Sequence, residues 1–436
     1  MKIVAFHNLG CKVNAYELDV LQQNFVKNGY TVVPFSQKAD IYIVNTCTVT
    51  AIADRKSRQM LHRAKALNPE AMVVALGCYV ETGKESILSD GAIDLAIGNH
   101  EKNKALSIIE DEIRKREGKT DIKADAGHKN DGKIIATDIG SVCEYEEMTL
   151  SGKVGRIRAD IKVEDGCNRF CSYCLIPYAR GRVRSRSIED TVKEISGLTK
   201  EGYSEFVLTG INLSCYSDDK DHDLLTLIRN IGDIDGVKRI RLSSLEPGVM
   251  TEDFIKGISG VPQICPHFHL SLQSGCDETL KRMNRRYTTK EYEESALLLK
   301  EYFDRPALTT DVIAGFPGES EEEFKKTCEF VSKIGFYEMH VFPYSVRKNT
   351  AAEKLHGKLT QAVKKERASM LINITEKQRE AYMAGLSGLE EELLIEKADS
   401  DKNGKFIYTG HLKRYVPVEL VSSDEHKPGD IVKYTC

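Results

Sequence analysis

The densest group of cysteines in the chain reads Gly166-Cys167-Asn168-Arg169-Phe170-Cys171-Ser172-Tyr173-Cys174. Three thiolates at C-x3-C-x2-C spacing on one short loop can bind three irons of a cubane 4Fe-4S cluster and leave the fourth iron without a protein ligand. An open metal position is typical of catalytic rather than closed structural sites. A zinc knuckle or chance spacing is the alternative, but no Cys or His follows Cys174 closely enough to complete a tetrahedral zinc site. The motif therefore predicts a catalytic iron–sulfur cluster.

A second set of cysteines is sparse but ordered. Each follows a strand-like segment: Cys11 after residues 3–6, Cys47 after residues 41–46 and Cys78 after residues 71–77. Helix-like stretches over 16–28 and 53–67 separate these strands, as in a doubly wound parallel sheet. Sites in such sheets form outside the carboxyl ends of the strands. We therefore expect the three thiols to converge and to hold a second cluster; three buried apolar thiols are the alternative.

A new alternation of strands and helices starts near residue 146. The strand-like segments are residues 157–163, 205–208, 239–242, 267–272, 309–314 and 338–342. The helix-like segments that separate most of them are residues 187–201, 223–230, 287–303 and 320–334. Six strand–helix units favour a (β/α) barrel, complete or partial, over an open sheet. Chemistry in such barrels gathers on the loops after the strands, and the cysteine triplet occupies the first of these loops.

Polar residues end the later strands of this segment. We expect them to bind the amino-acid head of a ligand, and they are Thr209, Gly210, Asn212, Ser243, Glu246, Gln273 and Asp311. Tyr173, inside the cysteine triplet, either lays its ring against a purine base or simply packs. The Gly-Phe-Pro-Gly-Glu-Ser stretch at 315–320 is either part of this site or a tight turn in which Ser320 caps the next helix.

Basic residues follow the cysteine triplet in alternation, at Arg180, Arg182, Arg184 and Arg186. Alternate residues of an extended segment share one face, so four guanidiniums are expected to line one side and to contact phosphates. A second basic stretch at 55–58, on the helix after Cys47, either extends this surface or is plain solvated surface.

The composition is that of a multidomain globular protein without a membrane span. The chain has 436 residues, of which 41% are hydrophobic and 29% charged, and no apolar run approaches the roughly 20 residues that a bilayer requires. A formal net charge of −4 means that nucleic-acid binding depends on local patches. Twelve cysteines indicate metal binding in a reducing, cytosolic compartment before disulfides. The remaining thiols are expected in the core or on the surface: Cys143, Cys215, Cys265, Cys276, Cys328 and Cys436.

The strand–helix alternation stops at the end of the first predicted domain and again in the C-terminal segment. Residues 110–133 are dense in Lys, Glu, Asp and Gly, which indicates a charged helix end and a solvated linker. After about residue 376 the helical pattern gives way to short β-like pieces at 393–396, 405–409 and 416–421. A small closed β-barrel is expected there, and such barrels often bind single-stranded nucleic acid.

These motifs resemble a known family. The C-x3-C-x2-C loop looks like that of radical SAM enzymes, in which the open iron chelates S-adenosylmethionine. Gly10–Asn14, Asn45–Thr50 and Gly77–Cys78, with the C-terminal β-like segment, resemble the methylthiotransferases of that superfamily over essentially the whole chain. The resemblance implies an α/β fold in three domains: an N-terminal doubly wound cluster domain (1–145), a radical SAM partial (β/α) barrel (146–375) and a TRAM-like RNA-binding β-barrel (376–436).

The branch of the family is indicated by few residues. Gly10–Asn14, Asn45–Thr50 and Ala179–Gly181 look most like the enzymes acting on N(6)-threonylcarbamoyladenosine at position 37 of tRNA. The resemblance implies two 4Fe-4S clusters, with S-adenosylmethionine cleaved at the cluster on Cys167, Cys171 and Cys174. The cluster on Cys11, Cys47 and Cys78 is then expected to hold or supply the sulfur that is added, with a methyl group, to C2 of the base.

The same resemblance implies binding partners, and it leaves open alternative substrates and an alternative function. The partners are a tRNA anticodon stem-loop and an electron donor such as a flavodoxin or ferredoxin, in the cytoplasm and away from membranes. Isopentenyladenosine in tRNA or a ribosomal-protein aspartate is an alternative substrate for a methylthiotransferase. An RNA-binding iron–sulfur sensor without turnover is the alternative from a different class of protein.

Overall fold

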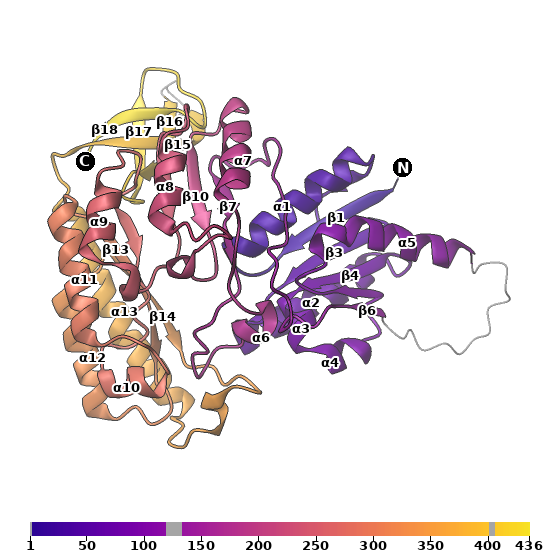
Figure 1. Ribbon diagram of the computed structural model, residues 1–436, viewed down its shortest axis with the longest axis horizontal. Coiled ribbons are helices and arrows are strands. Elements are labelled where there is room, and N and C mark those ends of the chain that lie inside the picture. Colours follow the sequence, from indigo (N-terminus) through magenta and orange to yellow (C-terminus); the bar gives the residue numbers. More distant parts are fainter. Residues whose placement is uncertain (1, 119–132, 401–405) are drawn as a thin grey trace. The chain divides into compact units, whose positions relative to one another are not determined.

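The structure is a computed structural model that describes residues 2–118, 133–400 and 406–436 (Figure 1). It contains two compact units, each assembled from several segments. The first unit comprises residues 1–154, 164–186 and 345–353, and the second comprises residues 155–163, 187–344 and 354–436. Among the described residues, no helix is both long enough and apolar enough to cross a membrane.

The first unit is built on a six-stranded parallel sheet with the order β2-β1-β3-β4-β5-β6. The strands are β1 (Ile3–Asn8), β2 (Thr31–Val33), β3 (Ile41–Thr46), β4 (Met72–Gly77), β5 (Leu95–Ile97) and β6 (Lys133–Ile135). The helices are α1 (Lys12–Lys27), α2 (Ala51–Leu67), α3 (Cys78–Thr82), α4 (Lys84–Leu88), η1 (Lys102–Lys104) and α5 (Ala105–Gly118). The expected charged helix end is α5, most of the expected linker lies outside the described residues, and β6 begins where a linker was expected.

Both faces of this sheet are covered, which confirms the doubly wound prediction. Phe6 of β1 packs edge-on against Phe25 of α1, with ring centroids 5.4 Å apart. The neighbouring Ala5 points to the other face, where it joins a buried cluster with Leu61 and Ala64 of α2. The strand order reverses between β1 and β3, and ligands of such sheets bind in the crevice that this reversal opens at the carboxyl ends.

The second unit contains six parallel strands in two sheets, β11-β10-β7 and β12-β13-β14. The strands are β7 (Ala159–Lys162), β10 (Glu205–Thr209), β11 (Arg239–Leu242), β12 (His267–His269), β13 (Ala307–Ala314) and β14 (Glu338–Pro343). A parallel bridge between Leu245 and Leu270 joins the sheets, because Leu245 N–H donates to the His269 carbonyl at 2.9 Å. The six strands therefore form one partial barrel, as the sequence predicts.

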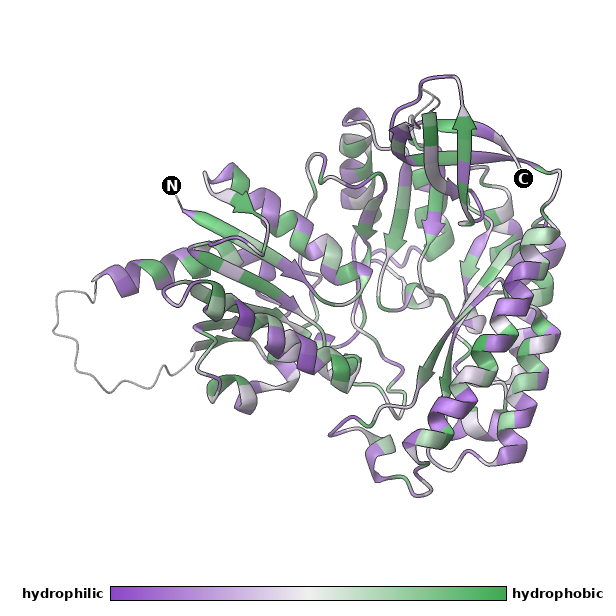
Figure 2. Ribbon diagram, turned by 180° about the vertical axis from the view of Figure 1, so that it is seen from behind, coloured by the Kyte–Doolittle hydropathy of each residue, from purple (hydrophilic) through white to green (hydrophobic). Residues whose placement is uncertain are grey.

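Helices cover the outside of this barrel in a continuous row (Figure 1). They are α7 (Ile188–Lys200), α8 (Leu224–Gly232), α9 (Glu252–Ser259), α11 (Thr289–Tyr302), α12 (Glu321–Ile334) and α13 (Gln361–Ala384). The connecting segments of this unit contain the short helix α10 (Asp277–Arg282) and the turns η2 (Leu213–Cys215) and η3 (Pro247–Val249), whereas most of η4 (Ala351–Lys354) belongs to the first unit. Hydrophilic and hydrophobic residues alternate along α11, α12 and α13 (Figure 2). The sequence did not predict α9 or α10. Ser320 caps α12 by accepting a hydrogen bond from Glu323 N–H, as expected. A role of residues 315–320 in the site stays a prediction.

The C-terminal segment forms a four-stranded antiparallel half-barrel with the order β17-β16-β15-β18. Its strands are β15 (Glu390–Ser400), β16 (Phe406–Leu412), β17 (Pro417–Ser422) and β18 (Ile431–Thr435). Strands β15 and β16 bring Leu393, Ile395, Tyr408 and Leu412 into one buried cluster. The boundary expected at residue 376 lies inside helix α13, so the division into three domains stays a prediction.

A buried ionic network joins the amino end of the barrel to this half-barrel. Glu205 is fully buried and accepts hydrogen bonds from Arg158 at 2.7 Å, Arg241 at 3.1 Å and Arg239 at 3.3 Å. Arg239 also donates to the Glu392 carbonyl of β15 at 2.6 Å. Burial alone would raise the pKa of Glu205, but the three guanidiniums outweigh burial and lower it.

Replacement of Glu205 by Gln is expected to lower the free energy of unfolding by about 3–5 kcal/mol, because it leaves buried guanidiniums without their carboxylate. The lowered pKa means that the ionised Glu205 contributes its stabilisation above its ordinary value of 4.5. This contribution is lost as the pH falls through the lower value in the folded protein. Urea unfolding of the wild type and of the exposed control Glu201→Gln measures the effect. An equal change in both variants at pH 7 would contradict the role of the network.

Candidate functional site

Three cysteines meet at the carboxyl edge of the first unit's sheet. Cys11 precedes α1, Cys47 follows β3 directly, and Cys78 begins α3 directly after β4. Because β1, β3 and β4 are adjacent and parallel, the loops that carry these cysteines lie at the same edge of the sheet, and their joint role as ligands stays a prediction. Burial raises the pKa of the Cys47 thiol to about 11, with smaller contributions from the nearby Cys78 and Cys11 sulfurs. The three thiols are therefore close enough to act on one another electrostatically.

The second trio, Cys167, Cys171 and Cys174, lies on the loop between β8 (Glu164–Asp165) and α6 (Ile176–Arg180), in the same unit. Cys167 N–H donates to the Gly181 carbonyl at 3.0 Å, and Cys174 N–H donates to the Cys171 carbonyl at 3.0 Å. Burial raises the pKa of Cys167 to about 12, and the Cys174 and Cys171 sulfurs raise it too. The three sulfurs of this loop are therefore close enough to act on one another electrostatically.

Gly166 is required at the start of this loop. Its φ is +82°, and a Cβ there would lie 1.9 Å from the Arg182 carbonyl oxygen. The close approach lets the loop run against the strand β9 (Arg184–Ser185), which pairs antiparallel with β8. Only glycine combines this conformation with this contact.

The two trios fit iron–sulfur clusters by their chemistry. Thiolate sulfur is the ligand that iron–sulfur clusters require, and a metal cation reverses the raised pKa of a buried thiol by deprotonating it on binding. No group of three His, Cys, Asp or Glu side chains within residues 2–118, 133–400 and 406–436 already has metal-ligand geometry. The match of each trio to an iron–sulfur cluster therefore depends on its three thiol ligands and on how close their sulfurs lie to one another.

Arg180 links the loops that carry the two trios. Its side chain is fully buried, and Nη1 donates to Asp165 of β8 at 2.9 Å and to Glu17 of α1 at 3.0 Å. Nη2 donates to Asn14 Oδ1 at 2.5 Å. Burial alone would lower the pKa of Arg180, but the carboxylates of Asp165 and Glu17 outweigh it and raise that pKa. Glu17 also pairs with the buried Lys102.

Two asparagines connect these groups to the cysteines. Asn14 donates to the Leu9 carbonyl at 2.9 Å and to the Thr46 carbonyl at 3.0 Å, so it joins the loops of Cys11 and Cys47. Asn99 donates to the Cys78 sulfur at 3.5 Å and to the Ala179 carbonyl at 2.6 Å. Residues that hold ligating loops in this way set the orientation of the ligands.

The structure corrects the expectation of four arginines on one exposed face. Arg184 and Arg186 are buried like Arg180: Arg184 donates to the Arg182 carbonyl at 2.9 Å, and Arg186 donates to Glu147 at 3.0 Å. Of the four, Arg182 alone is exposed. The alternation rule requires an extended segment, but Arg180 ends helix α6 and Gly181 turns the chain with a φ of +75°. A buried, paired guanidinium is not available to an RNA phosphate.

The predicted ligand-binding residues of the second unit lie at or near the carboxyl ends of its strands. Thr209 ends β10, and Ser243 follows β11, the adjacent strand. Both hydroxyl oxygens are buried without a hydrogen-bond partner among the described residues, as expected of groups that await a polar ligand. Gly210 and Asn212 follow Thr209 in the same loop, and Asn212 is buried.

The other members of this set have protein partners. Glu246 forms an ion pair with Arg285 at 3.0 Å. Gln273 has a φ of +68°, and its N–H donates to the Asp311 carbonyl at 2.8 Å. The Asp311 carboxylate lies 3.4 Å from His269 Nε2 of the neighbouring strand β12. Tyr173 is half-buried in the cysteine loop of the first unit, and its role stays a prediction.

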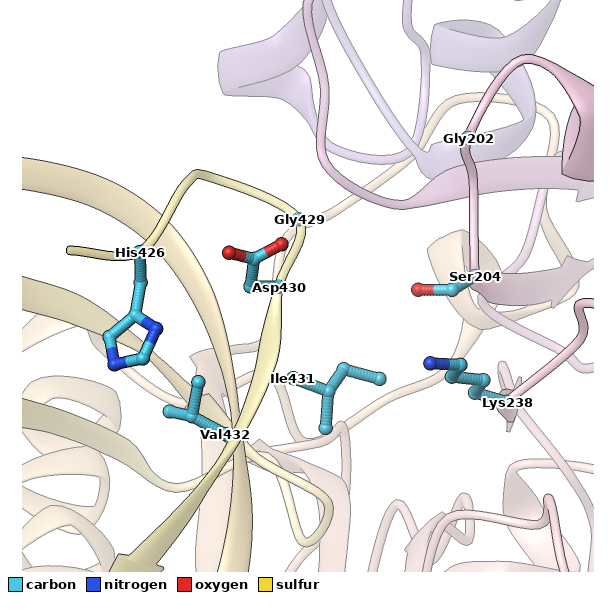
Figure 3. Close-up of a pocket in the computed structure, with 8 residues that line it drawn as sticks. All are labelled: Gly202, Ser204, Lys238, His426, Gly429, Asp430, Ile431 and Val432. Atoms are coloured by element: carbon cyan, nitrogen blue, oxygen red, sulfur yellow. The ribbon is translucent and has the colours of Figure 1, made fainter. Parts of the chain in front are cut away.

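Cavities outside these sites carry different chemistry. One of about 450 Å³ is lined by Ser204 and Lys238 of the barrel and by His426 and Asp430 of the half-barrel (Figure 3). Ser204 and Lys238 directly precede β10 and β11, so this cavity lies at the amino ends of the strands. Chemistry in parallel barrels occurs at the opposite ends.

Sequence reasoning missed the residues that hold the trios in place, namely Asn14, Glu17, Asn99, Lys102 and Arg347. Asn14 and Glu17 are buried on α1, three and six residues after Cys11. A charged residue such as Glu17 within this largely apolar stretch was a usable signal. Arg347 donates to Thr48 at 2.8 Å and to Asp54 at 2.7 Å. It is 299 residues from Thr48 along the chain, so no local pattern indicates the contact.

Two family models match the chain. The Radical SAM superfamily matches residues 161–331, and the Uncharacterized protein family UPF0004 matches residues 3–98. A solved structure of a radical S-adenosylmethionine methyltransferase, TsrM of Kitasatospora setae, is similar with a TM-score of 0.56 and 17% identity, and the match covers 78% of this chain and 73% of that chain. At this identity the similarity shows the fold alone.

Curated relatives are similar over nearly the whole chain. The chain is 41% identical over 392 residues to the Threonylcarbamoyladenosine tRNA methylthiotransferase MtaB of Aquifex aeolicus, which covers 90% of this chain and 92% of the relative. The enzyme of the same name from Bacillus subtilis is 37% identical, with 99% and 93% covered. The tRNA-2-methylthio-N(6)-dimethylallyladenosine synthase of Thermodesulfovibrio yellowstonii is 31% identical, with 99% and 95% covered.

Replacement of Arg180 by Met is expected to lower the free energy of unfolding by about 3 kcal/mol, because Asp165 and Glu17 then lose a buried cationic partner. The matched control is Arg182→Met, two residues away and exposed, which is expected to change stability by less than about 0.5 kcal/mol. Urea unfolding of the full chain measures both. If the two variants were equally stable, Arg180 would not hold the unit together.

Proposed function

Because this chain belongs to the radical SAM methylthiotransferase family, we propose that it adds a methylthio group to C2 of N(6)-threonylcarbamoyladenosine at position 37 of tRNA. The observation that carries the proposal is the pair of cysteine trios in one compact unit, joined through Arg180 and Asn99. The branch of the family is supported by identities of 41% and 37% to enzymes named for this nucleoside, against 31% to one named for dimethylallyladenosine.

Membership of this family implies S-adenosylmethionine and a 4Fe-4S cluster. We assign the cluster to Cys167, Cys171 and Cys174, and a second cluster to the trio of Cys11, Cys47 and Cys78. Bound together, the cluster and S-adenosylmethionine supply the one-electron chemistry that activates the C2–H bond of adenine. The electron comes from a reduced protein such as a flavodoxin or ferredoxin.

The chain's own residues bind and orient. The buried Thr209 and Ser243 hydroxyls are available to hydrogen-bond the polar head of S-adenosylmethionine. Arg180 fixes the loops of both trios. Burial raises the pKa of the Cys11 thiol, and the nearby Arg180 charge opposes that rise. The burial of Cys47, Cys78 and Cys171 keeps water from these three sulfurs.

The proposed partner of the chain is the anticodon loop of a tRNA. The adenosine at position 37 lies in a single-stranded anticodon loop, where turning a base out of the stack costs least. The C-terminal half-barrel is the second element proposed to hold this RNA, since small β-barrels bind single strands on an open face. A tRNA substrate also supports a cytoplasmic location for the proposed reaction.

The direct test uses the full chain reconstituted with iron and sulfide under anaerobic conditions, S-adenosylmethionine, a reductant and an anticodon stem-loop RNA. Mass spectrometry of the digested RNA is expected to show the 2-methylthio derivative of N(6)-threonylcarbamoyladenosine. An otherwise identical RNA that carries isopentenyladenosine is the control and is expected to stay unmodified. Product from the control RNA alone would contradict the proposed branch.

Loss of one cysteine is expected to affect the reaction differently in the two trios. Cys171→Ala removes a ligand of the proposed catalytic cluster and is expected to abolish both 5′-deoxyadenosine release and methylthio product. Cys47→Ala leaves that cluster intact, so 5′-deoxyadenosine release is retained while the product is lost. The control is Cys143→Ala, an exposed thiol of the same unit outside both trios. Chromatography of both products measures the split, and retained methylthio product in Cys47→Ala would refute the role of the second trio.

A further inference from the structure

A cavity of about 750 Å³ lies beside the two trios, entirely within the first unit. It is lined by the first turns of α2, by residues 79 and 81–86 of α3 and α4, by Leu175 and Tyr178, and by residues 346–349. Tyr79 directly follows Cys78, and Leu175 directly follows Cys174. Helices α3 and α6, which carry Tyr79 and Tyr178, pack against each other (Figure 1). This volume suits one or two nucleotides, since ligand sites span roughly 300–1,000 Å³.

The charges of this cavity leave cations without partners. Of the three carboxylates that line the cavity, Asp54 is paired with Arg347 at 2.7 Å, and Glu81 accepts a hydrogen bond from Asn99 N–H at 2.7 Å. The third, Glu85, is exposed. The cations that line the cavity and are exposed are Arg58, Lys84 and Lys348. None of the three has an ion-pair partner within the part of the chain that the structure describes. Four cations against three carboxylates leave the lining with a net positive charge, which is complementary to the phosphates of a nucleic-acid strand.

The rim of the cavity is unusually apolar for a charged surface. Tyr178 is 54% exposed and lines the cavity together with Val346, while Val49 and Ile52 are exposed beside Ala51. The Tyr178 ring packs edge-on against Phe170, with centroids 5.7 Å apart, so its position is fixed from one side. An exposed, supported aromatic ring beside unpaired cations is the combination that binds single-stranded nucleic acid through stacking and phosphate contacts.

We propose that this cavity, bounded by Arg58, Lys84, Lys348 and Tyr178, binds the single-stranded RNA loop that contains the modified adenosine. The inference rests on the proposed function, and it replaces the buried arginines at 180, 184 and 186 as the phosphate contacts beside the cysteine trios. Tyr178 stacks on a base of the loop, and the three cations contact its backbone. The exposed Tyr178 ring favours RNA over an acidic redox protein, because it offers a stacking surface for a base.

The test measures binding of a fluorescein-labelled anticodon stem-loop RNA to the full, reconstituted chain by fluorescence anisotropy at several salt concentrations. In Lys84→Ala/Lys348→Ala, affinity is expected to fall about tenfold, and the slope of log K against log salt to decrease by about 1.4, since each lost phosphate contact on a single strand contributes about 0.7. Tyr178→Ala is expected to lower affinity about tenfold with the slope unchanged.

The matched control is Lys38→Ala/Lys115→Ala, which removes the same charge from exposed positions of the same unit outside the cavity. It is expected to bind RNA like the wild type, and thermal unfolding is expected to be the same for all variants. Wild-type affinity and slope in Lys84→Ala/Lys348→Ala would overturn the inference. So would unchanged RNA binding with slower reduction by flavodoxin, which would assign the surface to the electron donor.

The outcomes separate this inference from the proposed function. If the wild type makes the methylthio product and the cavity variants bind RNA normally, the function stands and the cavity assignment fails. If the cavity variants lose RNA binding while the wild type modifies no threonylcarbamoyladenosine, the RNA surface stands and the proposed substrate fails.

Discussion

The buried ion pairs of Arg180 are the interaction on which the first unit depends. One guanidinium joins Asp165 of the cysteine loop to Glu17 and Asn14 of helix α1, which begins directly after Cys11. The two carboxylates and the Asn14 amide oxygen that face the Nη atoms of Arg180 offset the desolvation of these charges. Glu17 and Arg180 are 163 residues apart in the sequence, so their contact fixes the relative positions of two distant parts of the chain.

The second unit is also held together by a buried network of a carboxylate and guanidinium groups. Glu205 gathers three arginines at the amino end of the barrel, and Arg239 and Arg241 extend to backbone carbonyls of the half-barrel. The carboxyl ends of the strands are thereby left for ligands, where the unpartnered hydroxyls of Thr209 and Ser243 lie. In each unit a buried carboxylate–guanidinium network holds the scaffold, while the proposed chemistry occupies loops at the carboxyl ends of parallel strands.

Local patterns predicted the parts of the fold that depend on local forces. The strands before Cys47 and Cys78 are continuous apolar runs, and parallel topology then places their ends together. Patterns failed where long-range contacts decide: the alternating arginines were expected to be exposed, but Arg180 finds its carboxylate 163 residues away. Helices α9 and α10 are only eight and six residues long, too short for a clear periodic signal. The cavity beside Tyr178 combines four segments, which no single stretch of sequence reveals.

The central claim is that one compact unit of this chain holds two cubane clusters, each on three thiolates. Mössbauer spectroscopy of the full chain, reconstituted anaerobically with ⁵⁷Fe, tests it most directly. The account predicts about eight irons per chain in 4Fe-4S form, and a changed signal from a single iron site when S-adenosylmethionine is added. About four irons per chain, or a spectrum that S-adenosylmethionine leaves unchanged, would contradict it.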